Sequence, residues 1–209
     1  MQIDPALQRP ADNYKLLTNL IVPRPIAWIS TLNADGSVNL APFSFFNAVA
    51  SQPLYLAFSA GRHPDGRDKD TARNLRRSGE FVVSMVTEPL FAAMNLSAAE
   101  FPPEESEVLA AGLETAPGVK VQVPRVTASP VSMECRLHTS LELGHNTLFI
   151  GEVLLFHVAD ALVGERLHIQ DFAPLGRLGS PSVYCRTHDR FDEPRLSYAA
   201  WLAAQTGQD

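Results

Sequence analysis

Short extended runs account for most of the hydrophobic patterning along the chain. Runs of this length, rich in β-branched and aromatic residues, are typical of strands. They lie at residues 26–32, 54–60, 80–87, 119–123, 131–143 and 147–158. Turn residues 33–36 (Asn-Ala-Asp-Gly) predict a hairpin into residues 37–40, and Gly144-His145-Asn146 predicts another between the last two runs.

Helical patterns are fewer and shorter than the extended runs. Thr71 is positioned to cap a helix over residues 72–77, which Gly79 would close in the left-handed conformation. Further helices are predicted over 89–94, 103–111 and 196–204, the first two beginning at a proline. Because strands dominate and no strict βαβ alternation occurs, the pattern predicts a mainly β protein with helical additions, built as a closed antiparallel barrel.

No repeat, linker or low-complexity tract divides the chain. The 209 residues fit one domain over 1–209. Within it we expect the first residues, roughly 13 of them, to form an arm and residues 187–209 to form a C-terminal extension with a helix.

Composition narrows the class of protein. A hydrophobic share of 45% and a charged share of 19% exclude global disorder, and a formal net charge of -6 argues against a nucleic-acid binder. No stretch approaches the roughly 18 consecutive apolar residues of a membrane span, and the first ten residues contain no apolar run. We therefore expect a cytoplasmic protein that binds neither membrane nor nucleic acid.

The two cysteines are expected to be reduced thiols. Cys135 and His138, with Cys185 and His188, form two C-x-x-H pairs that could nominally hold zinc. If residues 131–143 are a strand, however, Cys135 and His138 point to opposite faces of the sheet. We expect no metal site.

A basic segment stands out against the acidic total. Residues 62–77 contain six basic and three acidic side chains, leaving eleven basic and twenty acidic in the rest of the chain. Lys69, the Thr71 hydroxyl and the free N–H groups of a helix N-terminus would suit a phosphate. The alternative is a solvated helix face on which Arg73, Arg76 and Arg77 point into water.

A second informative segment follows the first predicted hairpin. Residues 39–47 (Asn-Leu-Ala-Pro-Phe-Ser-Phe-Phe-Asn) combine aromatic rings with hydrogen-bonding side chains. Ser44 and Asn47 could bind the edge of a flat heteroaromatic ligand while neighbouring side chains cover its face. The alternative is that some of these phenylalanines belong to the barrel core.

Familiar catalytic motifs are absent from the sequence. There is no dinucleotide fingerprint, Walker lysine, G-x-S-x-G elbow or H-E-x-x-H motif. Among the six histidines, only His145 lies in a predicted turn suited to chemistry. An enzyme of this sequence would therefore need a cofactor for its difficult chemistry.

Taken together, four motifs resemble those of the flavin reductase-like, FMN-binding split-barrel family. They are Pro23-Arg24-Pro25-Ile26-Ala27-Trp28-Ile29-Ser30-Thr31, residues 35–47, Lys69-Asp70-Thr71 with Asn74, and Gly151-Glu152-Val153 followed by Arg177-Leu178-Gly179 and Tyr184. The resemblance covers about residues 14–186 and implies a homodimer of six-stranded antiparallel split β-barrels, with FMN near the subunit interface.

The resemblance also assigns residues to the cofactor. It implies that the phosphate and ribityl chain contact Ser30, Thr31, Lys69 and Thr71, with Ser59 and Arg62 as further phosphate-side positions. It implies that the isoalloxazine is lined by Ala41, Pro42, Phe43, Ser44 and Asn47, and that Arg24 and Asp70 also bind the cofactor. Many similar reductases carry a histidine at the position of Asn146, beside the nicotinamide. Here His145 is displaced by one residue, so both His145 and Asn146 are candidates for the nicotinamide side.

Two functions remain open from the sequence. The first is an FMN-dependent NAD(P)H oxidoreductase, which could deliver reduced flavin to a partner monooxygenase. The alternative, motivated by Asn146, is an FMN-binding electron-transfer protein without nicotinamide turnover.

Overall fold

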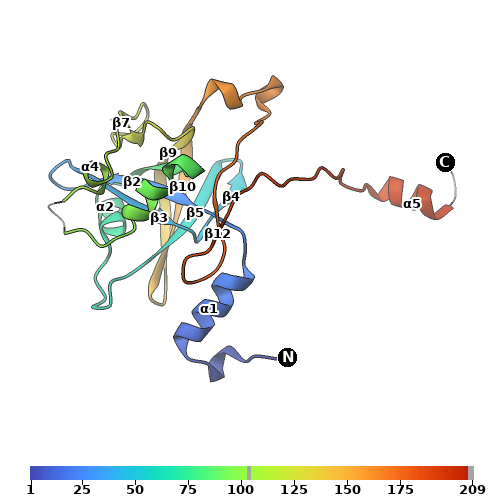
Figure 1. The fold of residues 1–209 in the computed structure, drawn as a ribbon, viewed down its shortest axis with the longest axis horizontal. Helices are drawn as coiled ribbons and strands as arrows, with labels where there is room; N and C mark the ends of the chain where they lie inside the picture. The colour runs from blue at the N-terminus through green and yellow to red at the C-terminus, as the bar shows by residue number, and fades with distance from the viewer. Residues whose placement is uncertain (103–104, 207–209) are drawn as a thin grey trace.

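The computed structural model describes residues 1–102 and 105–206 (Figure 1). Its main element is an antiparallel seven-stranded sheet with the strand order β3-β2-β6-β9-β10-β5-β4. These strands are β2 (Ala27–Leu32), β3 (Val38–Phe43), β4 (Phe46–Ser51), β5 (Leu54–Gly61), β6 (Glu80–Met85), β9 (Val131–Leu143) and β10 (Asn146–Val158). The protein is therefore mainly β with helical additions, as the sequence predicts.

The sheet differs from each expectation in one respect: it is not the closed barrel that the pattern predicts, and it has seven strands where the resemblance implies six. β3 and β4 are its two edges, yet only residues 44 and 45 separate them in the chain. So short a connection brings the two edges close together, and the sheet must curl. β3 and β4 are not paired with each other, so the curled sheet remains split. The additional strand is β4, which the sequence analysis missed because residues 46–51 lack a clear hydrophobic alternation.

Two small sheets lie outside the main one. β1 (Arg24–Pro25), β11 (Gly176–Arg177) and β12 (Tyr184–Cys185) form the first, and β7 (Thr115–Ala116) and β8 (Arg125–Val126) form the second. The strand predicted over residues 119–123 is wrong. The N–H groups of Val119, Lys120 and Val121 donate to the Glu134 carboxylate instead of to a neighbouring strand.

Glu134 is fully buried and also contacts His157, whose Nε2 lies 2.5 Å from Glu134 Oε1. Burial alone would raise the pKa of this carboxyl. The contact with His157 and the three backbone donors outweigh burial and hold the pKa below its ordinary value. The carboxylate thus fastens the 117–123 loop to the sheet.

The helices are α1 (Pro10–Leu20), α2 (Asp70–Ser78), α3 (Phe91–Leu96), α4 (Glu107–Ala110) and α5 (Tyr198–Thr206), with single 3-10 turns at Pro5–Leu7, Glu88–Leu90, Asp160–Leu162 and Glu165–Leu167.

The predicted helix over 89–94 is observed as a 3-10 turn followed by α3. The predicted 103–111 helix is shorter than expected, and its residues 103 and 104 lie outside the described residues. α1 was not predicted, although it lies partly within the expected N-terminal arm. Gly79 ends α2 with φ 68°, as expected.

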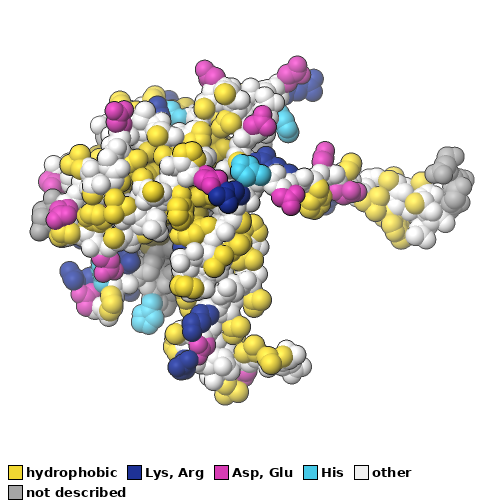
Figure 2. All heavy atoms as spheres, in the orientation of Figure 1, with side chains coloured by type: hydrophobic (Ala, Val, Ile, Leu, Met, Phe, Trp, Pro, Cys, Tyr) yellow, Lys and Arg dark blue, Asp and Glu magenta, His cyan; other side chains and the backbone are white. Residues whose placement is uncertain are grey.

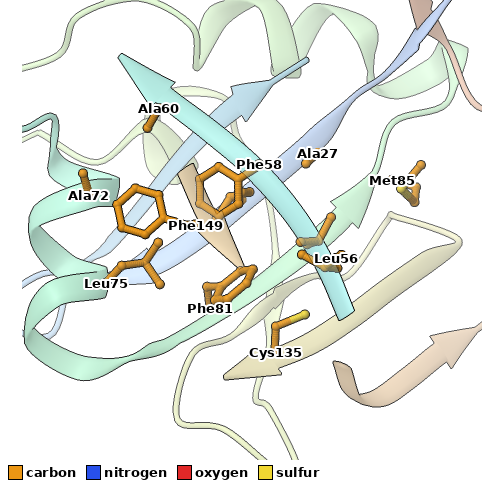
Figure 3. Close-up of a cluster of buried hydrophobic side chains, with 12 residues drawn as sticks. Ala27, Leu56, Phe58, Ala60, Ala72, Leu75, Phe81, Met85, Cys135 and Phe149 are labelled. Atoms are coloured by element: carbon orange, nitrogen blue, oxygen red, sulfur yellow. The ribbon is translucent and has the colours of Figure 1, made fainter. Parts of the chain in front are cut away.

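Three phenylalanines from different strands form the centre of the barrel core (Figure 3). The ring centroids of Phe58 and Phe149 are 5.3 Å apart, and Phe81 packs 5.7 Å from Phe58. A Cβ atom at Gly151 would lie 2.4 Å from Phe81 Cζ. Only glycine therefore lets β10 cross Phe81 at this distance, which gives the Gly151-Glu152-Val153 motif a packing role.

The C-terminal extension leaves the body of the molecule as an extended segment and ends in α5 (Figure 1). Hydrophobic side chains cover much of this projecting helix (Figure 2), and Tyr198 stacks on Trp201 with centroids 5.6 Å apart. Within the residues that the structure describes, no helix combines the length and apolar character needed to cross a membrane.

Candidate functional site

The candidate site consists of two cavities whose linings include consecutive residues at the junction of β3 and β4. The Lys69 cavity, about 130 Å³, lies between the start of α2, strand β3 and residues 97–101. The Arg24 cavity, about 340 Å³, lies between the end of α1, strand β1 and strands β4 and β5. Consecutive residues line one cavity each: Phe43 the first and Ser44 the second.

The start of α2 forms one wall of the Lys69 cavity. Lys69 is the N-cap residue, and no side chain caps the helix, so the predicted capping role of Thr71 is wrong. Thr71 instead accepts a 3.0 Å hydrogen bond from Asn39 Nδ2. The first N–H groups of a helix have no partner within it, so Lys69 and Thr71 stand beside backbone donors that suit an anion.

A buried polar network supports Thr71 from behind. Asn39 Nδ2 also donates to Thr31 Oγ1 at 3.1 Å, and Asn74 Nδ2 donates to the same oxygen at 3.1 Å. All four side chains are buried, with exposed fractions of 4% or less. The network fixes α2 against β2 and β3, so the position of Thr71 is set before any ligand arrives.

Three carboxylates, those of Asp70, Glu100 and Glu107, also line the Lys69 cavity. Glu100 Oε1 lies 3.7 Å from Lys69 Nζ and 3.8 Å from His63 Nδ1. Asp70 pairs with Arg73. Glu107 is buried and accepts a 3.2 Å hydrogen bond from the Leu40 N–H, and burial raises the pKa of its carboxyl. Among the described residues that line this cavity, Lys69 is the one Lys or Arg.

The five arginines of the basic segment 62–77 all bind other groups of the protein. Arg62 and Arg76 both pair with Asp68 and Glu142. Arg67 pairs with Asp65, Arg73 with Asp70, and Arg77 donates to the Leu32 carbonyl. Arg67, Arg73, Arg76 and Arg77 are nevertheless exposed, so the solvated helix face expected for the last three is observed. None of the five arginines lines the Lys69 cavity. Of the six basic residues, only Lys69 reaches it.

The Arg24 cavity has a different chemistry. Its lining includes Leu17, Ile21, Phe45, Phe46 and Leu148, with Ser44, Asn47 and Ser59 as polar members and no Asp or Glu. Arg24 is buried, and its Nη1 donates to the carbonyls of Thr18 at 2.5 Å and Ile21 at 2.7 Å, which fastens the end of α1 to the body.

The residues assigned to the cofactor are divided between the two cavities. Ala41, Pro42, Phe43, Lys69, Asp70 and Thr71 line the Lys69 cavity, whereas Arg24, Ser44, Asn47 and Ser59 line the Arg24 cavity. Ser30, Thr31 and Arg62 line neither. The Ser30 hydroxyl donates to the Pro124 carbonyl at 2.6 Å, Thr31 lies behind Thr71, and Arg62 is held by its two carboxylates.

The two nicotinamide-side candidates lie at the β9–β10 turn. His145 is exposed at the tip and lines neither cavity. The Asn146 side chain reaches the edge of the Arg24 cavity, where its Nδ2 donates to Ser59 Oγ at 2.9 Å. Asn146 is therefore closer than His145 to the cavity residues, through Ser59.

Some lining residues were not identified from the sequence. Asn39 lines the Lys69 cavity, and Asn74 lies behind it in the same hydrogen-bond network. Both belong to the family motifs, but the sequence does not indicate that their amides share Thr31. Glu107, His63 and residues 97–101 enter the Lys69 cavity only through tertiary contacts. The sequence signal for Glu107 was a glutamate in the first turn of a short helix, which is equally typical of a solvated helix end.

Cys135 lies in the core, and burial raises the pKa of its thiol. His138 is exposed and lies against Tyr55, with ring centroids 4.7 Å apart. Over residues 1–102 and 105–206 there is no group of three or more His, Cys, Asp or Glu side chains placed to hold a metal ion.

Comparison with known proteins agrees with this architecture. The chain is similar to the crystal structure of nitrilotriacetate monooxygenase component B from Bacillus cereus, with 38% identity, a TM-score of 0.88, and coverage of 92% of this chain and 98% of that one. It is also similar to the Pseudomonas fluorescens 2-nitrobenzoate 2-nitroreductase NbaA, at 31% identity, a TM-score of 0.86, and coverage of 95% and 98%.

A protein of Deinococcus radiodurans is 44% identical over 196 residues, which cover 90% of this chain and 86% of the relative. The flavin reductase like domain matches residues 19–191, a span that includes the strands of the main sheet and the residues lining both cavities, except Leu17. The chain therefore belongs to the flavin reductase-like, split-barrel family of flavin-binding proteins.

Proposed function

We propose that this protein is an FMN-dependent oxidoreductase that uses NAD(P)H to reduce flavin. The observation that carries the proposal is a cavity at the uncapped start of α2, beside Lys69, together with a larger apolar cavity. Consecutive residues, Phe43 and Ser44, line one cavity each. FMN has the matching chemistry, because a phosphate and a flat ring system are joined by a hydroxylated chain.

The residues present fit this cofactor. The Lys69 ammonium, the Thr71 hydroxyl and the N–H groups that open α2 would hold the phosphate. Ser44, Asn47 and Ser59 would bind polar ring edges in the Arg24 cavity, where Phe45 and Leu148 exclude water. A bound flavin supplies the two-electron chemistry that the side chains themselves lack. Positioning and water exclusion are then the contributions of the protein.

The proposal includes a partner for the reduced flavin. The similar Bacillus cereus protein is named as a component of a monooxygenase, which supports a role in delivering reduced flavin to an oxygenase. It also includes a homodimer. Leu141 and Leu143 on β9 and Val49 on β4 are exposed at 56%, 50% and 54%, and apolar side chains on a sheet face favour contact with a second copy.

The test is the absorption spectrum of the purified protein with added FMN. We expect a bound-flavin spectrum that bleaches under anaerobic conditions when NADH or NADPH is added, followed by steady oxidation of the nicotinamide when free flavin is the acceptor. A protein that ignores added FMN would contradict the proposal.

A second candidate is an FMN-binding electron-transfer protein without nicotinamide turnover. It is favoured by the position of His145, which is exposed and lines neither cavity, and by the bond that commits the Asn146 amide to Ser59. Bound FMN that stays oxidised with NADH and NADPH but accepts electrons from a reduced protein donor would select this candidate.

A further inference from the structure

Arg24 carries a buried positive charge that the described residues do not neutralise. Its side chain is 7% exposed and lines the Arg24 cavity. Nη1 is bound by two carbonyl oxygens, but Nε is buried without a hydrogen-bond partner in the part of the chain that the structure describes. A buried guanidinium with an unused donor and no carboxylate partner is costly unless an anion joins it.

A second arginine lies beside the first. Arg177 on β11 is the register partner of Arg24 on β1. Its Nη1 donates to the Tyr184 hydroxyl and its Nη2 to the Pro181 carbonyl, each at 2.5 Å, so these two partners are also neutral. Burial, and then the charge of Arg177, lower the pKa of Arg24. Two like charges in neighbouring strands favour the approach of a negative charge.

The surroundings select the kind of anion. The Arg24 guanidinium carbon lies 6.0 Å from the centre of the Phe45 ring, and the cavity wall is mostly apolar. A compact, strongly hydrated anion would lose its water here with few donors in return. A flat ring that spreads its negative charge keeps apolar contact with Phe45 and Leu148 while its charge meets Arg24.

We propose that Arg24, assisted by Arg177, makes this cavity selective for the reduced, anionic state of the flavin ring over the oxidised, neutral state. This inference rests on the proposed function. Arg24 here is a charge-compensating residue: the positive charge stabilises the state of the ligand that carries negative charge. Tighter binding of the reduced form also raises the midpoint potential of bound flavin relative to free flavin.

The experiment compares the affinities of oxidised FMN and of dithionite-reduced FMN, both under anaerobic conditions, in the wild type and in variants. Arg24→Met keeps an apolar stem and removes the charge. We expect it to lower the preference for reduced FMN about 10-fold, equivalent to about 30 mV in the midpoint potential. Arg24→Lys restores a charge and should recover part of the preference.

Arg177→Met provides a variant that leaves the bonds from Arg24 to α1 intact. We expect a change in the same direction but smaller, about threefold, and this variant decides the matter if Arg24→Met does not fold. Arg186→Met is the matched control, because Arg186 is exposed and pairs with Glu88. It should leave the preference unchanged.

The outcomes separate this inference from the proposed function. If the folded variants bind FMN but keep the wild-type preference between its two states, the inference is overturned and the proposed function stands. If the wild-type protein binds neither state, both are overturned.

Discussion

Consecutive residues line the Lys69 cavity and the Arg24 cavity, but the charged side chains of the two cavities give them opposite net charge. The Lys69 cavity combines one ammonium with Asp70, Glu100 and Glu107. The Arg24 cavity combines one guanidinium with apolar walls and no carboxylate. Sequence composition suggests the reverse, because Lys69 lies in the most basic segment of the chain and Arg24 lies between two prolines.

The difference shows that the charge of a cavity depends on pairing across the fold. The arginines near Lys69 are bound by acids from their own segment and by Glu142 of β9. Arg24 has backbone carbonyls as its hydrogen-bond partners within the described residues. A basic segment in a sequence can thus produce an acidic cavity, and an isolated arginine can produce a positive one.

The substitution Lys69→Ala is the most direct test of the contrast between the two cavities. If the Lys69 cavity holds the phosphate despite its acids, the loss of a charge-assisted hydrogen bond should weaken FMN binding by ~1.5–3 kcal/mol, or about 10- to 150-fold. Riboflavin, which lacks the phosphate, should bind equally to both proteins. Fluorescence titration of each flavin measures the effect.

Arg67→Ala is the control for that experiment, because Arg67 belongs to the same basic segment but pairs with Asp65 outside the cavity. It should bind FMN as the wild type does. Unchanged FMN affinity in Lys69→Ala would place the phosphate elsewhere.

A smaller effect is expected from the buried acid of the Lys69 cavity. Because burial raises the pKa of Glu107, the folded protein holds this proton more tightly than the unfolded chain does. The resulting stabilisation is present below the ordinary pKa of glutamate and is lost as the pH rises through the raised value. Glu107→Gln keeps an oxygen for the Leu40 N–H without a charge.

We therefore expect Glu107→Gln to gain stability relative to the wild type as the pH rises above the ordinary glutamate pKa of about 4.3. The gain in the free energy of unfolding should be on the order of 1 kcal/mol at neutral pH. Urea unfolding across the pH range measures it, with the exposed Glu114→Gln as the control. A gain that is independent of pH would contradict the assignment of the effect to titration.

The smallest effect is expected from Glu100, whose side chain is 71% exposed and lies 3.7 Å from Lys69. Exposed pairs contribute about 0.2–1 kcal/mol, so Glu100→Gln should tighten FMN binding by at most about fivefold. In the Lys69→Ala background this gain should vanish, because the cation that Glu100 shields is absent. A gain that persists there would show that Glu100 acts on the ligand by another route.

Local patterns were sufficient for much of the fold. The β9–β10 hairpin, β2, β5 and α2 follow from hydrophobic runs bounded by turn residues and by Gly79, because these signals act over a few residues. β4 and the 119–123 loop were not predicted correctly. β4 pairs with β5, from which only residues 52 and 53 separate it, so the weak alternation of β4 itself was the reason that it was missed. The 119–123 loop depends on the Glu134 carboxylate, which lies 13 to 15 residues further along the chain than the N–H groups it binds.

The candidate site was predictable in part. Lys69, Thr71 and Ser44 line the cavities, since their motifs place suitable groups at a helix start and at the β3–β4 junction, and their contact with a ligand stays a prediction. Ser30 and Thr31 were expected to contact the ligand, but their hydroxyls are bonded to Pro124 and to the asparagine network. The sequence shows that a hydroxyl lies at a strand end, but it does not show whether that hydroxyl faces a cavity or binds another part of the protein.

The sequence by itself determined the mainly β class, the family motifs with the split barrel that they imply, and a helix after Lys69 that ends at Gly79. Tertiary structure alone decided that the split lies between β3 and β4, that α2 begins at Asp70, that the assigned residues divide between two cavities, and which charges remain unpaired. The physical reason is distance. Turn and capping signals act between neighbours in the chain, whereas ion pairs and cavity walls join residues that only folding brings together.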